Sequence, residues 1–174
     1  MRQPPETNEH KRMGLVMQVL AWLAFLGLGV SFFGGHLERQ FNPNQHLETQ
    51  IAADGAREVI LQRNRFGHYV TSGSINGMPV TFLLDTGATG VAIPEDVART
   101  LNLRPGRPVR TQTANGIAIS YAVNLQRVSV GGIELSSVPA TISPGLQIDE
   151  VLLGMSFLRH IEFTQRGDTL ILRQ

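Results

Sequence analysis

The sequence predicts an all-β domain with one or two short helices, preceded by an N-terminal transmembrane helix. Three observations lead to this architecture. Residues 13–35 contain no charged side chain. Short β-rich runs then follow one another, separated by Asn-Gly and Gly-Gly pairs that are typical of tight turns. The 174 residues suffice for one domain, which usually needs about 100–150 residues, with attachments at its N-terminus.

Residues 13–35 are expected to form a membrane anchor. As a helix, the segment would be roughly 34 Å long, which is enough to cross a hydrocarbon core of about 30 Å. A cleaved signal peptide is the main alternative, but its apolar core is usually shorter and ends in small residues. Here bulky residues, Phe32 and Phe33, stand near the end of the segment. We therefore expect an uncleaved anchor that contacts membrane lipid.

Positive charge is concentrated before this anchor. Arg2, Lys11 and Arg12 precede it, whereas Arg39 is the only Lys or Arg in the twenty residues that follow. The positive-inside rule then predicts that residues 1–12 are a cytoplasmic leader. In a bacterium, the protein would be a single-pass inner-membrane protein with its domain on the periplasmic side.

The rest of the chain divides into a stalk and a domain. Residues 36–65 show little periodicity and are expected to be a stalk or linker, with one short helix or strand near Glu58–Gln62. Residues 66–174 form the candidate domain, with short helices expected at Glu95–Leu101 and Met155–His160. The expected strands are Tyr69–Ile75, Pro79–Leu84, Val109–Thr113, Ile117–Val123, Arg127–Val130, Ile133–Val138, Ala140–Ile142, Ile161–Thr164 and Thr169–Arg173.

The composition argues against several classes of function. The absence of cysteine removes disulfides, thiolate metal sites and thiol nucleophiles. The five histidines are scattered, with no pair at helical spacing, so we expect no metal and no cofactor. A net charge of +1 argues against a nucleic-acid partner, because such binders normally show a clustered basic excess.

Asp85 is the candidate catalytic residue. It follows the apolar run Phe82-Leu83-Leu84 and begins Asp-Thr-Gly-Ala. An acid placed directly after a buried strand should stand on a buried floor, and Gly87 permits a turn that brings backbone N–H groups to the carboxylate. A second apolar-apolar-glycine sequence, Leu152-Leu153-Gly154, follows 69 residues later.

Other interpretations of these acids and hydroxyls are weaker. An isolated aspartate at a strand end is usually a turn-forming residue. Asp149 and Glu150 are adjacent, so on a strand they would point to opposite faces rather than form a carboxylate pair. Ser72-Gly73-Ser74 lacks the Gly-x-Ser-x-Gly frame of a serine nucleophile.

Four sequence features together resemble the retroviral-type aspartic proteases, the retropepsins, and more closely their membrane-anchored bacterial relatives. They are Leu-Leu-Asp-Thr-Gly-Ala at 83–88, Ile93-Pro94 before a helix, a hairpin at 113–116, and Leu-Leu-Gly-Met-Ser-Phe-Leu at 152–158. The resemblance implies a small retropepsin-like acid-protease barrel with a psi-shaped active-site loop. It also implies a homodimer in which each chain supplies one catalytic Asp85, with terminal strand pairing through Thr169–Arg173.

The same resemblance implies roles for the residues around Asp85. Five would support the active-site loop, and three would form the tip of a flap that closes over an extended peptide or protein substrate. The implied loop residues are Thr86, Gly87, Ala88, Leu153 and Gly154, and the implied flap residues are Asn115, Gly116 and Ile117.

The count of aspartates supports the homodimer independently. Among five aspartates only Asp85 lies in Asp-Thr-Gly, whereas two-domain enzymes of the pepsin type carry two such motifs in one chain. The predicted function is an aspartic endopeptidase that hydrolyses peptide bonds through a water activated by a pair of Asp85 carboxylates. The alternative is a catalytically silent retropepsin-fold module for dimerisation or peptide binding on a membrane stalk.

Overall fold

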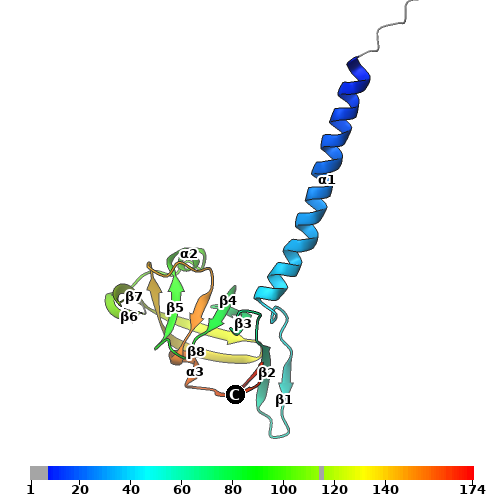
Figure 1. Ribbon diagram of the computed structural model, residues 1–174. Coiled ribbons are helices and arrows are strands. Elements are labelled where there is room, and N and C mark those ends of the chain that lie inside the picture. The colour runs from blue at the N-terminus through cyan, green and yellow to red at the C-terminus, as the bar shows by residue number, and fades with distance from the viewer. Residues whose placement is uncertain (1–7, 114–115) are drawn as a thin grey trace, which may run out of the picture. The chain divides into compact units, whose positions relative to one another are not determined.

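Helix α1 (Asn8–Phe41) occupies most of the first of two units, which divide between Glu38 and Arg39 (Figure 1). The computed structural model describes residues 8–113 and 116–174, without the side chains of residues 8–11. By length and composition, the stretch Arg12–Phe41 could cross a membrane. Its large apolar side chains are exposed all along its length, as expected of a helix that faces lipid.

The second unit contains a four-stranded antiparallel sheet that joins the two ends of the domain. Val59 and Leu61 on one strand and Leu170 and Leu172 on another point into the core, and the residues between them face outward. In spatial order the strands are β1 (Thr49–Ile51), β2 (Arg57–Gln62), β11 (Thr169–Arg173) and β10 (Glu162–Arg166).

Strand β11 is paired on both of its edges within the chain, to β2 on one side and to β10 on the other. The resemblance to retropepsins implied that this strand, Thr169–Arg173, pairs with a second chain. Neither edge is open for such pairing, because β2 and β10 already take up its backbone groups. In this arrangement β11 cannot add a further strand from a second chain.

Part of the segment expected to be a stalk is built into this domain. β2 covers the strand expected near Glu58–Gln62 and buries Val59 and Leu61 completely. Asn44, which is 4% exposed, donates from Nδ2 to the carbonyls of Gln62 and Val70 at 2.9 and 2.7 Å. Its Oδ1 accepts from the Gln62 N–H at 2.7 Å. A buried amide therefore fixes a segment that has no hydrophobic periodicity.

A seven-stranded sheet forms the body of the domain. Its first strand in spatial order, β3 (Val70–Ile75), also pairs with its sixth, β7 (Gly116–Val130), and this additional pairing curls the sheet towards a barrel. The predicted Asn76-Gly77 hairpin is present, with positive φ at both residues. In spatial order the strands are β3 (Val70–Ile75), β4 (Met78–Leu84), β9 (Val151–Leu153), β5 (Val91–Pro94), β8 (Ile133–Ser143), β7 (Gly116–Val130) and β6 (Pro108–Thr113).

The structure corrects several expected elements. The runs expected at Ile117–Val123 and Arg127–Val130 merge into β7, because buried Leu125 continues the strand between them. β5 and β9 were not expected as strands. The two short helices are present as α2 (Glu95–Thr100) and α3 (Met155–Leu158), each ending slightly before its predicted limit. The predicted β-rich fold with few helices is confirmed.

Candidate active site

Asp85 stands where β4 ends beside β9. The two strands run parallel, with Leu83 opposite Leu152 and Leu84 opposite Leu153. The N–H of Asp85 then donates to the carbonyl of Leu153 at 3.2 Å. Because parallel strands end at the same edge of a sheet, the acid and the glycine at position 154 come together although they are far apart in the sequence.

The loop after Asp85 turns back onto the carboxylate. The Gly87 N–H donates to Asp85 Oδ1 at 2.8 Å, and the Ala88 N–H donates to the Asp85 carbonyl at 3.2 Å. A Cβ at position 87 would lie 3.1 Å from Oδ1, so a glycine permits this close approach. Asp85 and Ala88 are half-buried, whereas Thr86 and Gly87 are exposed. The carboxylate is therefore oriented by the backbone at the domain surface.

Gly154 packs against the back of the same loop. A Cβ at this position would lie 2.3 Å from the carbonyl oxygen of Gly90 and 2.6 Å from that of Ala88. The next N–H, of Met155, donates to the Ala88 carbonyl at 2.9 Å. The second apolar-apolar-glycine sequence thus holds the loop in place, and only a residue without a side chain fits there.

Ser156 is a supporting residue that sequence reasoning missed. It is 8% exposed, and its Oγ accepts from the Val91 N–H at 2.9 Å and donates to the Pro139 carbonyl at 2.8 Å. One hydroxyl therefore joins α3 to β5 and β8 beneath the Asp85 loop. In the sequence, Ser156 is marked only by its position directly after Gly154-Met155. Such a position does not distinguish a buried serine from an exposed one.

Strands β6 and β7 form a hairpin at the position where the flap is expected. Thr113 Oγ1 donates to the Gly116 carbonyl at 2.8 Å, and Gly116 has a φ of 109°. The side chains of Ile117 and Ile119 are 65% and 64% exposed near its end. Asn115, the third predicted flap residue, lies outside the described residues.

Ionic contacts gather on the outer face of the four-stranded sheet. Arg173 contacts Asp54, Glu58 at 3.5 Å and Glu162 at 3.9 Å. A hydrogen bond from the Ala56 N–H, and then one from Arg173, lower the pKa of Asp54 below its ordinary value of 3.8. Hydrogen bonding to Asp54 in turn raises the pKa of Arg173. Within the part of the chain that the structure describes, no three acidic or histidine side chains are grouped to hold a metal ion.

Comparison with known proteins agrees with this geometry. A family model described as "gag-polyprotein putative aspartyl protease" matches residues 71–160, which include Asp85 and Gly154. The chain belongs to the retropepsin-like aspartic protease family. This membership follows from the length of the match, which includes the ends of β4 and β9, where the candidate site lies.

Relatives of this retropepsin-like chain come from bacteria. A Sinorhizobium protein from the cobV 5′ region is 38% identical over 125 residues, which are 70% of this chain and 54% of the relative. A Rickettsia prowazekii protein is 32% identical over 119 residues, which are 66% of this chain and 51% of the relative. The chain therefore spans about half the length of the curated relatives it matches.

A solved structure supports the retropepsin-like fold. The crystal structure of a retropepsin-like aspartic protease from Rickettsia conorii is 27% identical to this chain, with a TM-score of 0.56. The match covers 74% of this chain and 94% of the Rickettsia chain. The match covers a larger share of this chain than residues 71–160, the region that the family model matches.

Proposed function

We propose that the protein is a membrane-anchored aspartic endopeptidase whose active site is completed by a second copy of the chain. The observation that carries the proposal is the placement of Asp85. Asp85 is a half-buried residue at the end of β4, its carboxylate accepts a hydrogen bond from the Gly87 N–H, and it belongs to the only Asp-Thr-Gly of the sequence. One chain therefore supplies one of the two carboxylates that the chemistry needs.

The proposed mechanism follows from the electrostatics of paired carboxylates. Two such groups about 3 Å apart cannot both ionise at low cost, so the pair holds one proton. The ionised Asp85 takes a proton from a water molecule, whose oxygen attacks the peptide carbonyl carbon. The protonated Asp85 of the partner subunit gives its proton to the carbonyl oxygen. The C–N bond then breaks as the nitrogen gains a proton, which leaves an acid and an amine.

The substrate and the location are parts of the same proposal. An extended peptide segment of a protein would lie between the Asp85 pair and the β6–β7 hairpin, and its backbone would pair like an added strand. The excess of Lys and Arg before the anchor favours a cytoplasmic N-terminus and a domain on the periplasmic side. Anchoring two copies in one membrane raises their local concentration and favours their association.

The test is peptide cleavage by the full chain in detergent or nanodiscs, with a diverse peptide library at about pH 4–8. We expect Asp85→Asn to lower the rate of cleavage about a thousandfold or more, as loss of a residue that acts on the reacting atoms does. The matched control is Asp96→Asn, an exposed acid on α2 that pairs with Arg99. The pH profile should be bell-shaped, because the carboxylate pair titrates as a unit.

Two outcomes would contradict the proposal. If Asp85→Asn cleaved peptides at the rate of the wild type, the activity would not depend on Asp85. Absence of cleavage by the wild-type chain, with peptide binding that Asp85→Asn does not change, would instead favour the catalytically silent binding module.

A further inference from the structure

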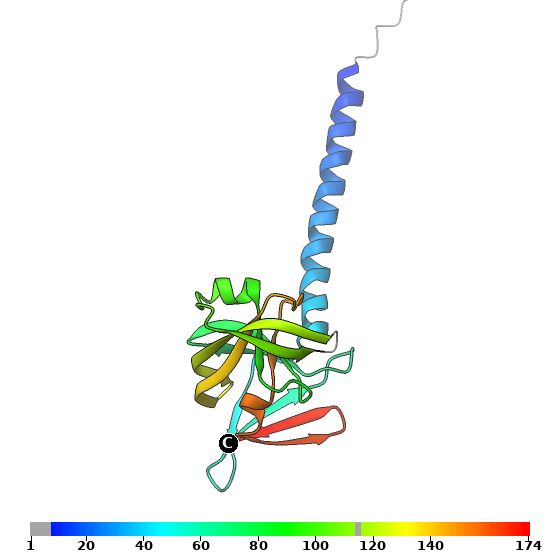
Figure 2. The ribbon, with the colours of Figure 1, turned by 90° about the vertical axis from the view of Figure 1, so that its left-hand side faces the viewer.

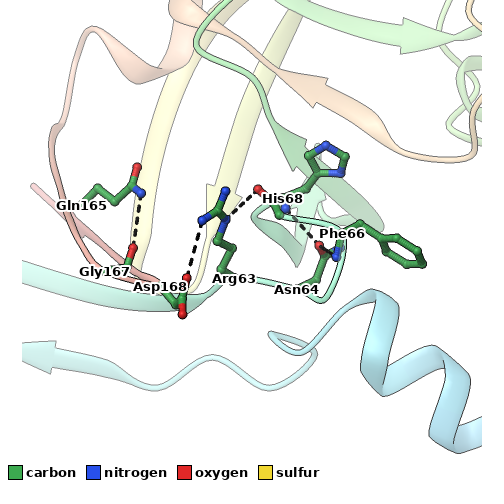
Figure 3. Close-up of polar contacts among 8 residues, drawn as sticks. Arg63, Asn64, Phe66, His68, Gln165, Gly167 and Asp168 are labelled. Carbon is green, nitrogen blue, oxygen red and sulfur yellow. Dashed lines mark hydrogen bonds and ion pairs between the residues drawn. The ribbon is translucent and has the colours of Figure 1, made fainter.

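The loop between β2 and β3 is attached to the end of α1. Asn64, which is 7% exposed, donates from Nδ2 to the carbonyl of Phe41 at 2.9 Å. Phe41 is the last residue of α1, where the helix itself leaves carbonyl groups without a partner. Asn64 Oδ1 accepts from the N–H groups of Phe66 and His68 at 3.0 and 2.9 Å (Figure 3). One buried amide therefore fixes the loop to the helix end, and both lie within the second unit.

The rest of the loop is also held in place. Arg63 Nε donates to the Gly67 carbonyl at 2.9 Å, and Gly67 has a φ of 88°. Arg63 forms an ion pair with Asp168 at 3.5 Å, at the tip of the β10–β11 hairpin, which is red in Figure 2. Phe66 is therefore presented by a loop that hydrogen bonds and an ion pair fix at several points.

Two aromatic rings and a cation form an exposed patch beside the helix end. Phe41 and Phe66 are 40% and 54% exposed, and their ring centroids lie 6.3 Å apart. The guanidinium carbon of Arg65 lies 4.7 Å from the centre of the Phe66 ring, and Arg65 Nη1 donates to Gln40 Oε1. We call Phe41, Arg65 and Phe66 the aromatic patch. Single exposed apolar residues are normal, whereas adjoining exposed rings mark a surface that contacts another molecule.

The sequence places this patch at the level of lipid headgroups when α1 crosses a membrane. The uncharged run of the anchor ends at Gly35, and Phe41 follows about 9 Å further along the helix. The headgroup region extends about 5–8 Å beyond the hydrocarbon core, and helix side chains lean towards the N-terminal end, which here is the anchor. The Phe41 ring therefore reaches the headgroup region, and the Phe66 ring lies against it.

We propose that the aromatic patch is a lipid contact, in which the two rings enter the headgroup region of the membrane that α1 spans and Arg65 binds lipid phosphate. Aromatic side chains are enriched at this level of a bilayer, and the planar guanidinium of arginine suits phosphate. Arg39, in the last turn of α1, adds a second positive charge near the same surface. The proposal rests on the membrane anchor of the proposed function and not on its catalytic part.

The lipid contact would keep the candidate active site near the membrane. The carbonyl of Tyr69 accepts from the Leu84 N–H at 3.0 Å, and Asp85 is the next residue. The path from Phe66 along the chain to Tyr69, and across this pair to Asp85, spans at most about 20 Å. The site would therefore meet peptide segments that lie close to the membrane surface.

A second copy of the chain is the main alternative occupant of the patch. Two copies that met through it about a two-fold axis would bring two Arg65 side chains together, and the patch has no carboxylate to separate them. A bilayer needs no such arrangement, because its phosphate groups supply the opposite charge. The charge of the patch therefore favours lipid.

Tryptophan fluorescence tests the contact, because the chain has one tryptophan, Trp22, and it lies in the anchor. Full-length chains are placed in nanodiscs of phosphatidylcholine and phosphatidylglycerol, with or without bromine high on the acyl chains, since bromine quenches a tryptophan that contacts it. Trp22→Phe combined with Phe66→Trp moves the single tryptophan to the patch, where an exposed position accepts the larger ring. We expect brominated lipid to lower its emission about twofold or more.

The matched control combines Trp22→Phe with Ile51→Trp. Ile51 is 66% exposed, which is more than Phe66, and it is opposite Arg57, about 20 Å along β2 from Arg63. Brominated lipid should leave the emission of this variant unchanged. The wild-type chain is the positive control, because Trp22 should be quenched wherever α1 crosses the bilayer.

Charge reversal tests the part that Arg65 plays. In the Phe66→Trp chain, we expect Arg65→Glu to remove about half or more of the quenching, because a carboxylate is repelled by lipid phosphate. The loss should be larger with phosphatidylglycerol than with phosphatidylcholine alone. Arg104→Glu, at an exposed position in the loop after α2, changes the net charge equally and should leave the quenching intact.

The outcomes separate this contact from the rest of the proposed function. Quenching at position 22 but not at position 66 would overturn the lipid contact and leave the anchor. No quenching at position 22 would remove the anchor and the contact together. Equal quenching at positions 66 and 51 would contradict a contact specific to the patch, and a blue-shifted but unquenched tryptophan at position 66 would assign the patch to a protein. Peptide cleavage by the wild type and by Asp85→Asn tests the catalytic proposal separately.

Discussion

The two sheets of the domain differ in how their edges end. The seven-stranded sheet curls round through the β3–β7 pairing, and among the described strands its outer edge is β6 of the β6–β7 hairpin. The four-stranded sheet is open on both sides, at β1 and at β10. The curled sheet leads into the Asp85 loop, whereas the open sheet has outer edges that no described strand covers. One sheet therefore carries the candidate site, and the other joins the segment after α1 to the last strand of the domain.

The largest expected effect is in the seven-stranded sheet, at Gly154. We expect Gly154→Ala to lower the free energy of unfolding by about 4 kcal/mol, or to prevent folding, because its Cβ would overlap the carbonyl oxygens of Gly90 and Ala88. Urea denaturation measures the change. The control is Gly145→Ala, where a Cβ would meet no atom within 4 Å. Similar stabilities for the two variants would mean that the loop is not tightly packed.

A somewhat smaller effect is expected in the four-stranded sheet, at Leu61. Leu61→Ala should cost about 3 kcal/mol of unfolding free energy, because the side chain is fully buried and its removal leaves a cavity. Its neighbour Ile60, 37% exposed on the other face, is the matched control, and Ile60→Ala should cost much less. If both variants lowered the unfolding free energy by the same small amount, β2 would not be packed in the core, as expected of a stalk.

The smallest effect is expected on the outer face of the open sheet, at Asp54. Its pKa is lowered in the folded state, so its stabilising contribution is complete above its ordinary value of 3.8 and is lost as the pH falls below it. Asp54→Asn should therefore be slightly less stable than the wild type at about pH 7 and equal to it at about pH 2. Thermal denaturation at the two pH values measures this difference. A difference that does not change with pH would exclude the ionised carboxylate as its source.

Sequence patterns predicted the elements that have a strong local signal. The hairpin at Asn76-Gly77 was predicted because both residues accept a positive φ. Asp85 was predicted because an apolar run precedes it and a glycine that permits a tight turn follows it. In both cases the determining interactions lie within a few residues of chain.

The elements that were missed depend on distant contacts. β9 has three residues and β5 has four, which is too short for either to show a period, and each is a strand because the neighbouring strands bond to it. Asn44 lies in the segment that was expected to be a stalk or linker, because residues 36–65 show little periodicity. It is buried because the backbone groups of Gln62 and Val70 meet its amide, and no local pattern predicts this.

Asn44 also determines where α1 can be removed without disturbing the domain. Its side-chain amide forms hydrogen bonds with the backbone of β2 and β3, only a few residues after α1 ends at Phe41. A cut between Asn44 and β2 would separate Asn44 from the domain, and its hydrogen bonds would be lost with it. A cut after β2 would also remove a central strand of the four-stranded sheet. A form without α1 that keeps these hydrogen bonds must therefore begin at or before Asn42.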